Sequence, residues 1–314
     1  MTGLRLLALV VASLAFAPPL PANEEDIKSL ATMIDERVAA AWGKEVRPAP
    51  MADDAEFFRR VHLDLAGRIP SVTEARDFLD DDRPEKRRLW VNRILQGDAD
   101  DPSYKDAYIN HFANVWRAWL LAQTDQQRSQ QPALEAWLRY RLKANVGYDR
   151  LVRELLNQPA AGAEAPDPAR GSAAVIYQAN EFKPENLAGS TARLFLGVKL
   201  ECAQCHDHPF DKWTRTQFWQ YAGFFTDVMP PSPGGQPGRA RGALKIPGQD
   251  KMVRARFLDG REPQWVDGSR TRPTLAAWMT AADNPFFARA VVNRMWVYFF
   301  GTGLVKRAEG PGDE

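Results

Sequence analysis

The only two cysteines of the chain lie in one short motif, Cys202-Ala203-Gln204-Cys205-His206. This CxxCH spacing is typical of covalent haem c attachment. Two thiols one helical turn apart reach the two porphyrin vinyl groups from one side, and the histidine that follows places an imidazole under the iron. The sequence therefore predicts that Cys202 and Cys205 bind haem c and that His206 is the proximal ligand of the iron.

Two other chemistries can use the same residues. His208 supplies a fourth donor beside Cys202, Cys205 and His206, which is the number that tetrahedral zinc takes, although structural zinc sites usually draw ligands from two separated segments. A disulfide between the two cysteines is the other alternative. An oxidising compartment would favour it, but so small a loop gains little stability from it. His208 is too close in sequence to reach the opposite haem face, so we expect it beside the haem, or as a ligand in the zinc alternative.

The residues around the motif suit a haem pocket by type. Six aromatic residues could form its apolar wall: Phe210, Trp213, Phe218, Trp219, Phe224 and Phe225. Three basic residues could meet the haem propionates: Arg193, Lys212 and Arg215. Candidates for the second axial ligand are named by type alone: Met229, Met252, Met279, His111 and His62. Methionine is more often a core filler, and His62, which stands among apolar residues, is expected to be a buried structural histidine.

The first 22 residues resemble a cleavable signal peptide. Arg5 precedes an apolar run over residues 6–16, and Ala22 offers a small residue for cleavage. We therefore expect export to the periplasm or cell envelope, where haem c is attached. No later stretch reaches the roughly 20 apolar residues of a membrane helix, so no integral membrane segment is expected after cleavage.

The composition is that of an ordinary globular protein, with 45% hydrophobic residues and a net charge of +1. No basic cluster indicates a nucleic-acid partner. The expected partner is an unidentified redox protein of the cell envelope.

Helical periodicity dominates the chain after residue 22. The pattern predicts a mainly α, multi-helix globular domain with Pro/Gly-rich loops and at most a few short strands. A capping box is expected where Ser71 precedes Glu74 by three residues. The expected helices cover residues 27–41, 57–65, 71–79, 84–95, 104–121, 132–156, 184–198, 216–225 and 284–300, and short strands are expected at 253–258 and 264–266.

Three segments together resemble a large secreted family found in planctomycetes and their relatives, described as cytochrome-c-like. They are FFRRVHLDLAGRIPSVTEARDFL at residues 57–79, LGVKLECAQCHDHPFDKWTRTQFWQYAGFF at 196–225, and NPFFARAVVNRMWVYFFGTGLV at 284–305. The resemblance implies a cytochrome-like site at Cys202, Cys205 and His206, and a companion C-terminal domain. Neither domain type has an established function.

The expected organisation is a signal peptide at 1–22, a helical cytochrome-c-like domain at 23–229, a linker with short strands at 230–272, and the truncated start of a second helical domain at 273–314. The leading function is an exported haem-c-binding protein with an electron-transfer role. The alternative is a non-redox secreted binding or scaffold protein whose CxxCHxH site binds zinc or another metal or forms a disulfide. A third is a polysaccharide hydrolase using carboxylates such as Asp207 and Asp211. Whether the chain is an enzyme stays open.

Overall fold

The computed structural model describes residues 24–42, 47–98, 101–121, 131–159, 171–228, 242–265 and 270–305. The fold is mainly α-helical, as the sequence predicts, and the described residues contain one two-stranded sheet. The chain divides into two compact units, Met1–Asp53 and Asp54–Glu314. None of the described helices is both long enough and apolar enough to cross a bilayer.

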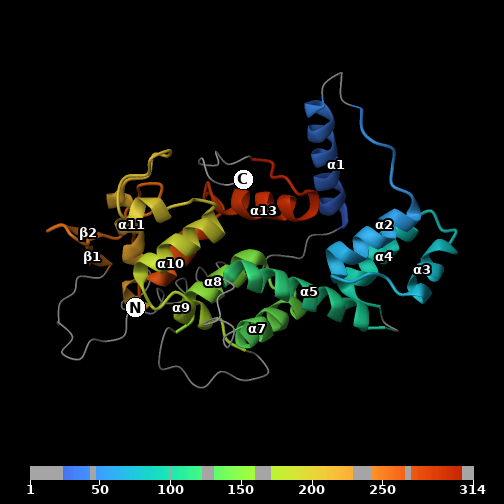
Figure 1. Ribbon diagram of the computed structural model, residues 1–314, viewed down its shortest axis with the longest axis horizontal. Coiled ribbons are helices and arrows are strands. Elements are labelled where there is room, and N and C mark those ends of the chain that lie inside the picture. The colour runs from blue at the N-terminus through green and yellow to red at the C-terminus, as the bar shows by residue number, and fades with distance from the viewer. Residues whose placement is uncertain are drawn as a thin grey trace, which may run out of the picture. The chain divides into compact units, whose positions relative to one another are not determined.

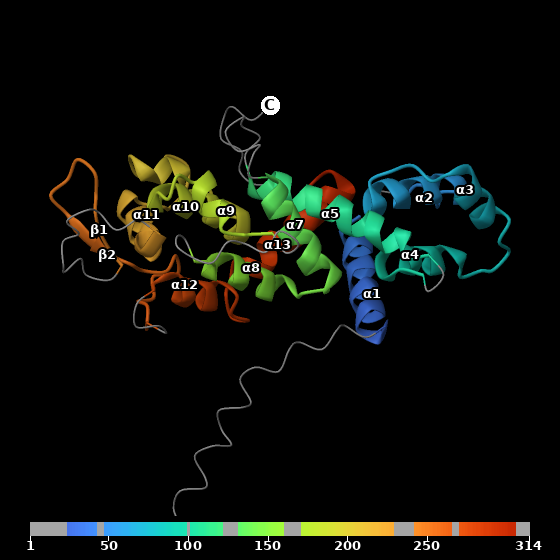
Figure 2. The same cartoon turned by 90° about the horizontal axis from the view of Figure 1, so that it is seen from below.

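The first unit contains α1 (Glu24–Ala41), which confirms the helix expected at 27–41. The second unit contains the other helices and strands. They are α2 (Asp54–Val61), η2 (His62–Ala66), α3 (Val72–Leu79), α4 (Lys86–Gln96), α5 (Ser103–Leu120), α7 (Gln131–Lys143), α8 (Tyr148–Asn157), α9 (Val175–Ala179), α10 (Pro184–Thr191), η3 (Ala192–Leu196), η4 (Glu201–Gln204), α11 (Arg215–Ala222), η5 (Gly223–Val228), β1 (Ala243–Lys245), β2 (Met252–Arg254), α12 (Arg272–Met279) and α13 (Phe287–Phe300). Within this unit, α2–α4 lie at one end, and α10, α11 and the β-hairpin lie at the other (Figures 1 and 2).

The helices at the α2–α4 end pack around a small aromatic cluster. Phe58 stacks on Phe78 with ring centroids 4.3 Å apart, and Trp90 meets Phe58 edge-on at 4.8 Å. The expected capping box starts α3: Glu74 N–H donates to Ser71 Oγ at 3.2 Å, and Ser71 N–H donates to the Glu74 carboxylate at 2.6 Å. Arg68 also donates twice to that carboxylate, which fixes the turn between η2 and α3.

Two helices end in a π-helical turn, and both turns contact α13. In η2, Arg68 N–H donates to the carbonyl of His62, so the carbonyl of Asp64 lacks its usual helical partner. In η3, Gly197 N–H donates to the carbonyl of Ala192, so the carbonyl of Arg193 also lacks its usual helical partner. On α13, Tyr298 donates to Asp64 O at 2.7 Å and Arg294 donates to Arg193 O at 3.3 Å. Because these residues are four apart on one helix face, α13 supplies the missing partner to both turns.

Gly67 ends the first π turn in the left-handed conformation, with φ +66°. A Cβ at this position would lie 2.1 Å from Nδ1 of His111 on α5. His111 Nε2 lies 2.6 Å from the hydroxyl of Tyr298 and donates to it, since that hydroxyl gives its own proton to Asp64. Burial lowers the pKa of His111 and raises that of Tyr298, so both side chains are neutral at physiological pH.

A buried ion pair joins α12 to the end of η5. Arg272 is 2% exposed, and its Nε donates to Asp227 at 2.9 Å. Its Nη1 donates to the carbonyls of Leu156 and Gln158, where α8 ends. Thr271 N–H donates to the same Asp227 carboxylate. The segment at 271–272, which sequence patterning placed in a linker, therefore contributes fully buried side chains to the core.

Several expected boundaries are wrong. The single helix expected over 132–156 is two helices, α7 and α8, because Asn145 adopts a left-handed conformation with φ 49° between them. Of the strand expected at 253–258, only residues 253–254 are in a strand, the end of β2, which pairs with β1 so that Ala243 lies opposite Arg254. Residues 264–265 are not in a strand. Short helix α9 and helix α12 were not expected. Both are too short for apolar periodicity to mark them clearly.

Candidate functional site

The CxxCH motif begins in a short 3₁₀ turn, η4, rather than at the end of a long helix. Ala203 is fully buried and anchors this turn in the core, whereas Cys202 and Cys205 are exposed free thiols. Side chains at positions i and i+3 of a 3₁₀ helix lie one above the other. Cys202 lies within this turn and Cys205 directly follows it, so both thiols are at the surface of one short segment.

His206 is exposed and oriented by its own neighbour. Its Nδ1 lies 2.8 Å from the carbonyl oxygen of Asp207. A carbonyl only accepts, so Nδ1 carries the proton, and Nε2 of the neutral ring keeps its lone pair. This is the tautomer in which histidine binds a metal through Nε2 while its other nitrogen donates to the protein.

His208 is the opposite tautomer, with the proton on its other ring nitrogen. Its Nδ1 accepts the backbone N–H of Phe210 at 3.1 Å, so Nε2 carries the proton in the neutral ring. The backbone N–H of His208 donates to the carbonyl of Trp213 at 2.8 Å, which closes the loop between them. His208 is half-buried and fastens this loop, whereas His206 offers a free lone pair.

Helix α11 holds the motif through the carbonyl of Gln204. The indole N–H of Trp219 donates to this carbonyl at 3.1 Å, and Nε of Arg215 donates to it at 3.3 Å. Arg215 also donates through Nη2 to Pro247 O at 2.5 Å, so one guanidinium links the motif to the hairpin. The carboxylate of Asp207 accepts the backbone N–H of Arg215 at 2.7 Å, where α11 begins. Sequence reasoning missed this clamp, because its central acceptor is a backbone carbonyl that no residue type reveals.

The residues expected to line a haem pocket do not lie together around one pocket. Five of the six aromatic side chains lie in the hydrophobic core instead of a pocket wall: Trp213, Phe218, Trp219, Phe224 and Phe225. Phe210 is 67% exposed beside the motif. Among the basic residues, Arg193 pairs with Glu201 at 3.0 Å, and Lys212 lies over the Trp213 ring at 5.1 Å.

The candidates for a second axial ligand are dispersed. His62 is fully buried, with Nδ1 bonded to the carbonyl of Phe58 at 3.0 Å, and Met279 is also fully buried. His111 is bonded to Tyr298, and Met252 is 58% exposed on β2. Met229 lies outside the described residues, as does the expected signal peptide at 1–22.

The donor set expected for zinc does not gather in the described part of the chain. No three His, Cys, Asp or Glu side chains there are placed to hold one metal ion. The carboxylates considered for hydrolysis serve local turns: Asp207 accepts from Arg215 N–H, and Asp211 accepts from Lys212 N–H at 2.7 Å.

Comparison with known proteins found no match among curated proteins or among solved structures. Two family profiles do match. The profile of PSD1, a protein of unknown function (DUF1553), covers residues 271–314. The profile of PSCyt2, a protein of unknown function (DUF1549), covers residues 33–229 and includes the CxxCH motif. The expected pair of companion domains of unknown function is thereby confirmed, whereas the planctomycete and cytochrome-c aspects stay predictions. Because the first profile spans more than half of its length, the chain belongs to the PSCyt2 family.

Proposed function

We propose that this protein is an exported haem-c-binding protein with a role in electron transfer in the cell envelope. In this proposal, Cys202 and Cys205 hold the haem through thioether bonds, and His206 binds the iron through Nε2. The observation that carries the proposal is the hydrogen bond from His206 Nδ1 to the Asp207 carbonyl, which leaves Nε2 able to bind iron. Bound haem would supply one-electron exchange at iron.

The exposure of the two thiols supports covalent attachment. Both are free and solvent-accessible, so the attachment machinery can reach them without unfolding the core. The buried Ala203 and the bonds to the Gln204 carbonyl keep the backbone in place between them. A rigid backbone at the tether limits the reorganisation that accompanies each electron transfer.

Phe210 and Lys212 are the neighbouring side chains best suited to contact the haem. Phe210 offers an exposed apolar ring, and Lys212 is an exposed cation that suits a propionate. Arg193 already pairs with Glu201, and Arg215 already donates to the carbonyls of Gln204 and Pro247, so neither is proposed to contact a propionate.

The decisive experiment is a haem stain on a denaturing gel, using protein made in a host with the haem-attachment machinery. Wild-type protein should stain and show a sharp visible band on reduction. Replacing both cysteines by alanine should abolish the stain, because no thioether bond can form. His206→Ala should keep the thiols but alter the visible spectrum, because iron loses its imidazole. His208→Asn, the matched control, should keep the stain and change the spectrum little.

Metal and thiol analysis of the same samples separates the alternatives. Stoichiometric zinc that falls in the double cysteine variant and in both histidine variants, without a haem stain, would establish the metal-binding alternative. A disulfide unaffected by either histidine substitution, again without haem, would establish the thiol alternative.

Export is tested separately: the protein from the envelope fraction should begin near Asn23, and a cytoplasmic protein starting at Met1 would contradict both export and haem attachment.

A further inference from the structure

A cavity of about 520 Å³ lies between the second half of α11 and the segment that follows β2. Its volume is within the range of small-molecule sites, roughly 300–1,000 Å³. Seven residues line it: Gln220, Arg254, Ala255, Arg256, Glu262, Pro263 and Trp265. None of them belongs to the CxxCH motif or to the clamp that holds it.

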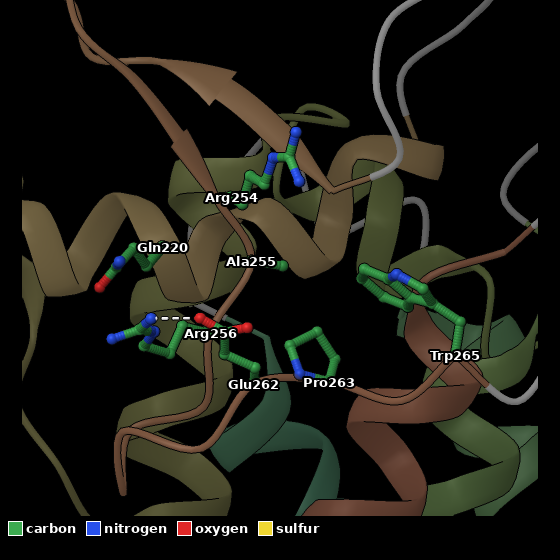
Figure 3. Close-up of a pocket in the computed structure, with 7 residues that line it drawn as sticks. All are labelled: Gln220, Arg254, Ala255, Arg256, Glu262, Pro263 and Trp265. Atoms are coloured by element: carbon green, nitrogen blue, oxygen red, sulfur yellow. Dashed lines mark hydrogen bonds and ion pairs between the residues drawn. The ribbon is translucent and has the colours of Figure 1, made fainter.

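The cavity walls differ in character. Figure 3 shows Arg256 and Glu262 together on one side and Trp265 on the opposite side, with Ala255 between them. Arg256 and Glu262 form an ion pair, so their charges offset each other. The side chain of Arg254 is exposed at the rim and makes no ion pair or hydrogen bond with the described part of the chain. The lining therefore carries one uncompensated positive charge.

The backbone under the cavity is firmly fixed. Ala255 N–H donates to the carbonyl of Gly242 at 2.7 Å, and Arg256 N–H donates to the carbonyl of Gln220 at 3.2 Å. A Cβ on Gly242, where φ is +69°, would lie 2.9 Å from both the Trp265 ring and Ala255. The absence of a side chain on Gly242 thus lets the indole lie close to this backbone. Trp265 also meets Phe224 of the core at 5.9 Å.

We propose that this cavity binds a small cyclic carboxylate. The free guanidinium of Arg254 suits a carboxylate, to which arginine can donate two parallel hydrogen bonds. Trp265, Pro263 and Ala255 give an apolar surface against which a ring can pack. The Gln220 amide and the Glu262 carboxylate offer hydrogen-bond partners for hydroxyl groups on that ring. Both a sugar acid and a hydroxylated aromatic acid have this chemistry.

The test is calorimetric titration of the full-length protein with D-glucuronate and with 4-hydroxybenzoate. Their uncharged counterparts, D-glucose and phenol, are the ligand controls. At least one acid should bind saturably, and its counterpart should bind much more weakly, because the carboxylate carries the recognition. The acid that binds identifies the ring chemistry as sugar or aromatic. Failure of both acids to saturate at about 10 mM, or equal binding of acid and counterpart, would overturn the proposal.

Substitutions then locate the binding. Arg254→Gln should lower the affinity for the acid by roughly ten- to a hundredfold, the range for losing a hydrogen bond to a charged group. Arg59→Gln, at an exposed arginine of α2, is the matched control and should leave affinity unchanged. Trp265→Ala should also weaken binding, with circular dichroism used to confirm that the variant is folded. Equal affinity in the Arg254 and Arg59 variants would place the acid elsewhere and refute the assignment. The outcome does not depend on haem, so it is independent of the proposed redox function.

Discussion

The hydroxyl of Tyr298 donates a hydrogen bond to the backbone carbonyl of Asp64, 234 residues earlier in the chain. Asp64 lies in the segment matched by the PSCyt2 profile, and Tyr298 lies in the segment matched by the PSD1 profile. With the Arg294 bond to Arg193 and the Arg272 bond to Asp227, this contact joins the two family segments. In this chain the two segments share one hydrophobic core.

Replacing Tyr298 by phenylalanine should lower the free energy of unfolding by about 1–2 kcal/mol, because the Asp64 carbonyl and His111 each lose a partner. Urea unfolding followed by circular dichroism measures the change. Tyr108→Phe is the matched control: its hydroxyl has no bond to the described residues, so stability should hardly change. Equal effects in the two variants would show that the Tyr298 bond contributes nothing specific.

Arg272→Met should destabilise the protein by about 3–5 kcal/mol, because it leaves the largely buried Asp227 carboxylate without its cation and the Gln158 carbonyl without its donor. The same unfolding assay applies. Arg261→Met removes an exposed arginine that pairs with Asp259, and it should have a much smaller effect. Adding Asp227→Leu to Arg272→Met should restore part of the loss, since the unpaired charge is then gone. A double variant no more stable than the single would argue against this explanation.

Trp219→Phe keeps an aromatic ring in the core but removes the donor to the Gln204 carbonyl. We expect faster hydrogen exchange at residues 202–206, because the turn that carries the thiols is held less tightly. Trp213→Phe is the control, since it shortens an equally buried tryptophan whose indole N–H has no bond within the described residues. Exchange at 202–206 that rises equally in both variants would point to general loosening of the core.

Glu74→Gln should reduce the dependence of stability on acid. Hydrogen bonds from Arg68 lower the pKa of Glu74 from 4.5 to about 2. A depressed carboxyl pKa contributes stability above the unfolded-state value, and this contribution is lost as pH falls from 4.5 to 2. The contribution at neutral pH is on the order of 2 kcal/mol, since Arg68 is partly solvated. Unfolding measured between pH 7 and pH 2 should show the wild type losing this advantage, and a constant difference between the proteins would contradict it.

His62 should add a second acid-sensitive step nearby. Burial lowers its pKa, so the folded state binds fewer protons than the unfolded state, and stability falls once pH drops below about 6.5. The groups facing its ring are Glu74, whose Oε1 lies 3.8 Å from Nε2, and Arg68 beyond it. His62→Gln should flatten the stability profile between pH 6.5 and pH 5, whereas Glu74→Gln should not.

The sequence predicted most helices, but not the features that depend on distant partners, and the role of the CxxCH residues stays a prediction. The 3.6-residue apolar pattern located α1, α5 and α13, and the serine-to-glutamate spacing located the start of α3. The π turn at Asp64 could not be predicted, because its carbonyl accepts no backbone N–H of its own helix and is instead bonded by the side chain of Tyr298, far away in sequence. The CxxCH residues were evident from type and spacing. Their support by Trp219 was not, because its acceptor is a peptide carbonyl.

The contacts of α13 also constrain the order of folding. During synthesis, the residues of both π turns are made long before those of α13, whose side chains donate to their free carbonyls. Contacts of such sequence separation close large loops and form slowly. Until α13 arrives, the carbonyls of Asp64 and Arg193 depend on water, and the helices around them are free to return to ordinary α-helical bonding. The helices that contain Asp64 and Arg193 therefore adopt their final geometry only after the residues of α13 have been synthesised.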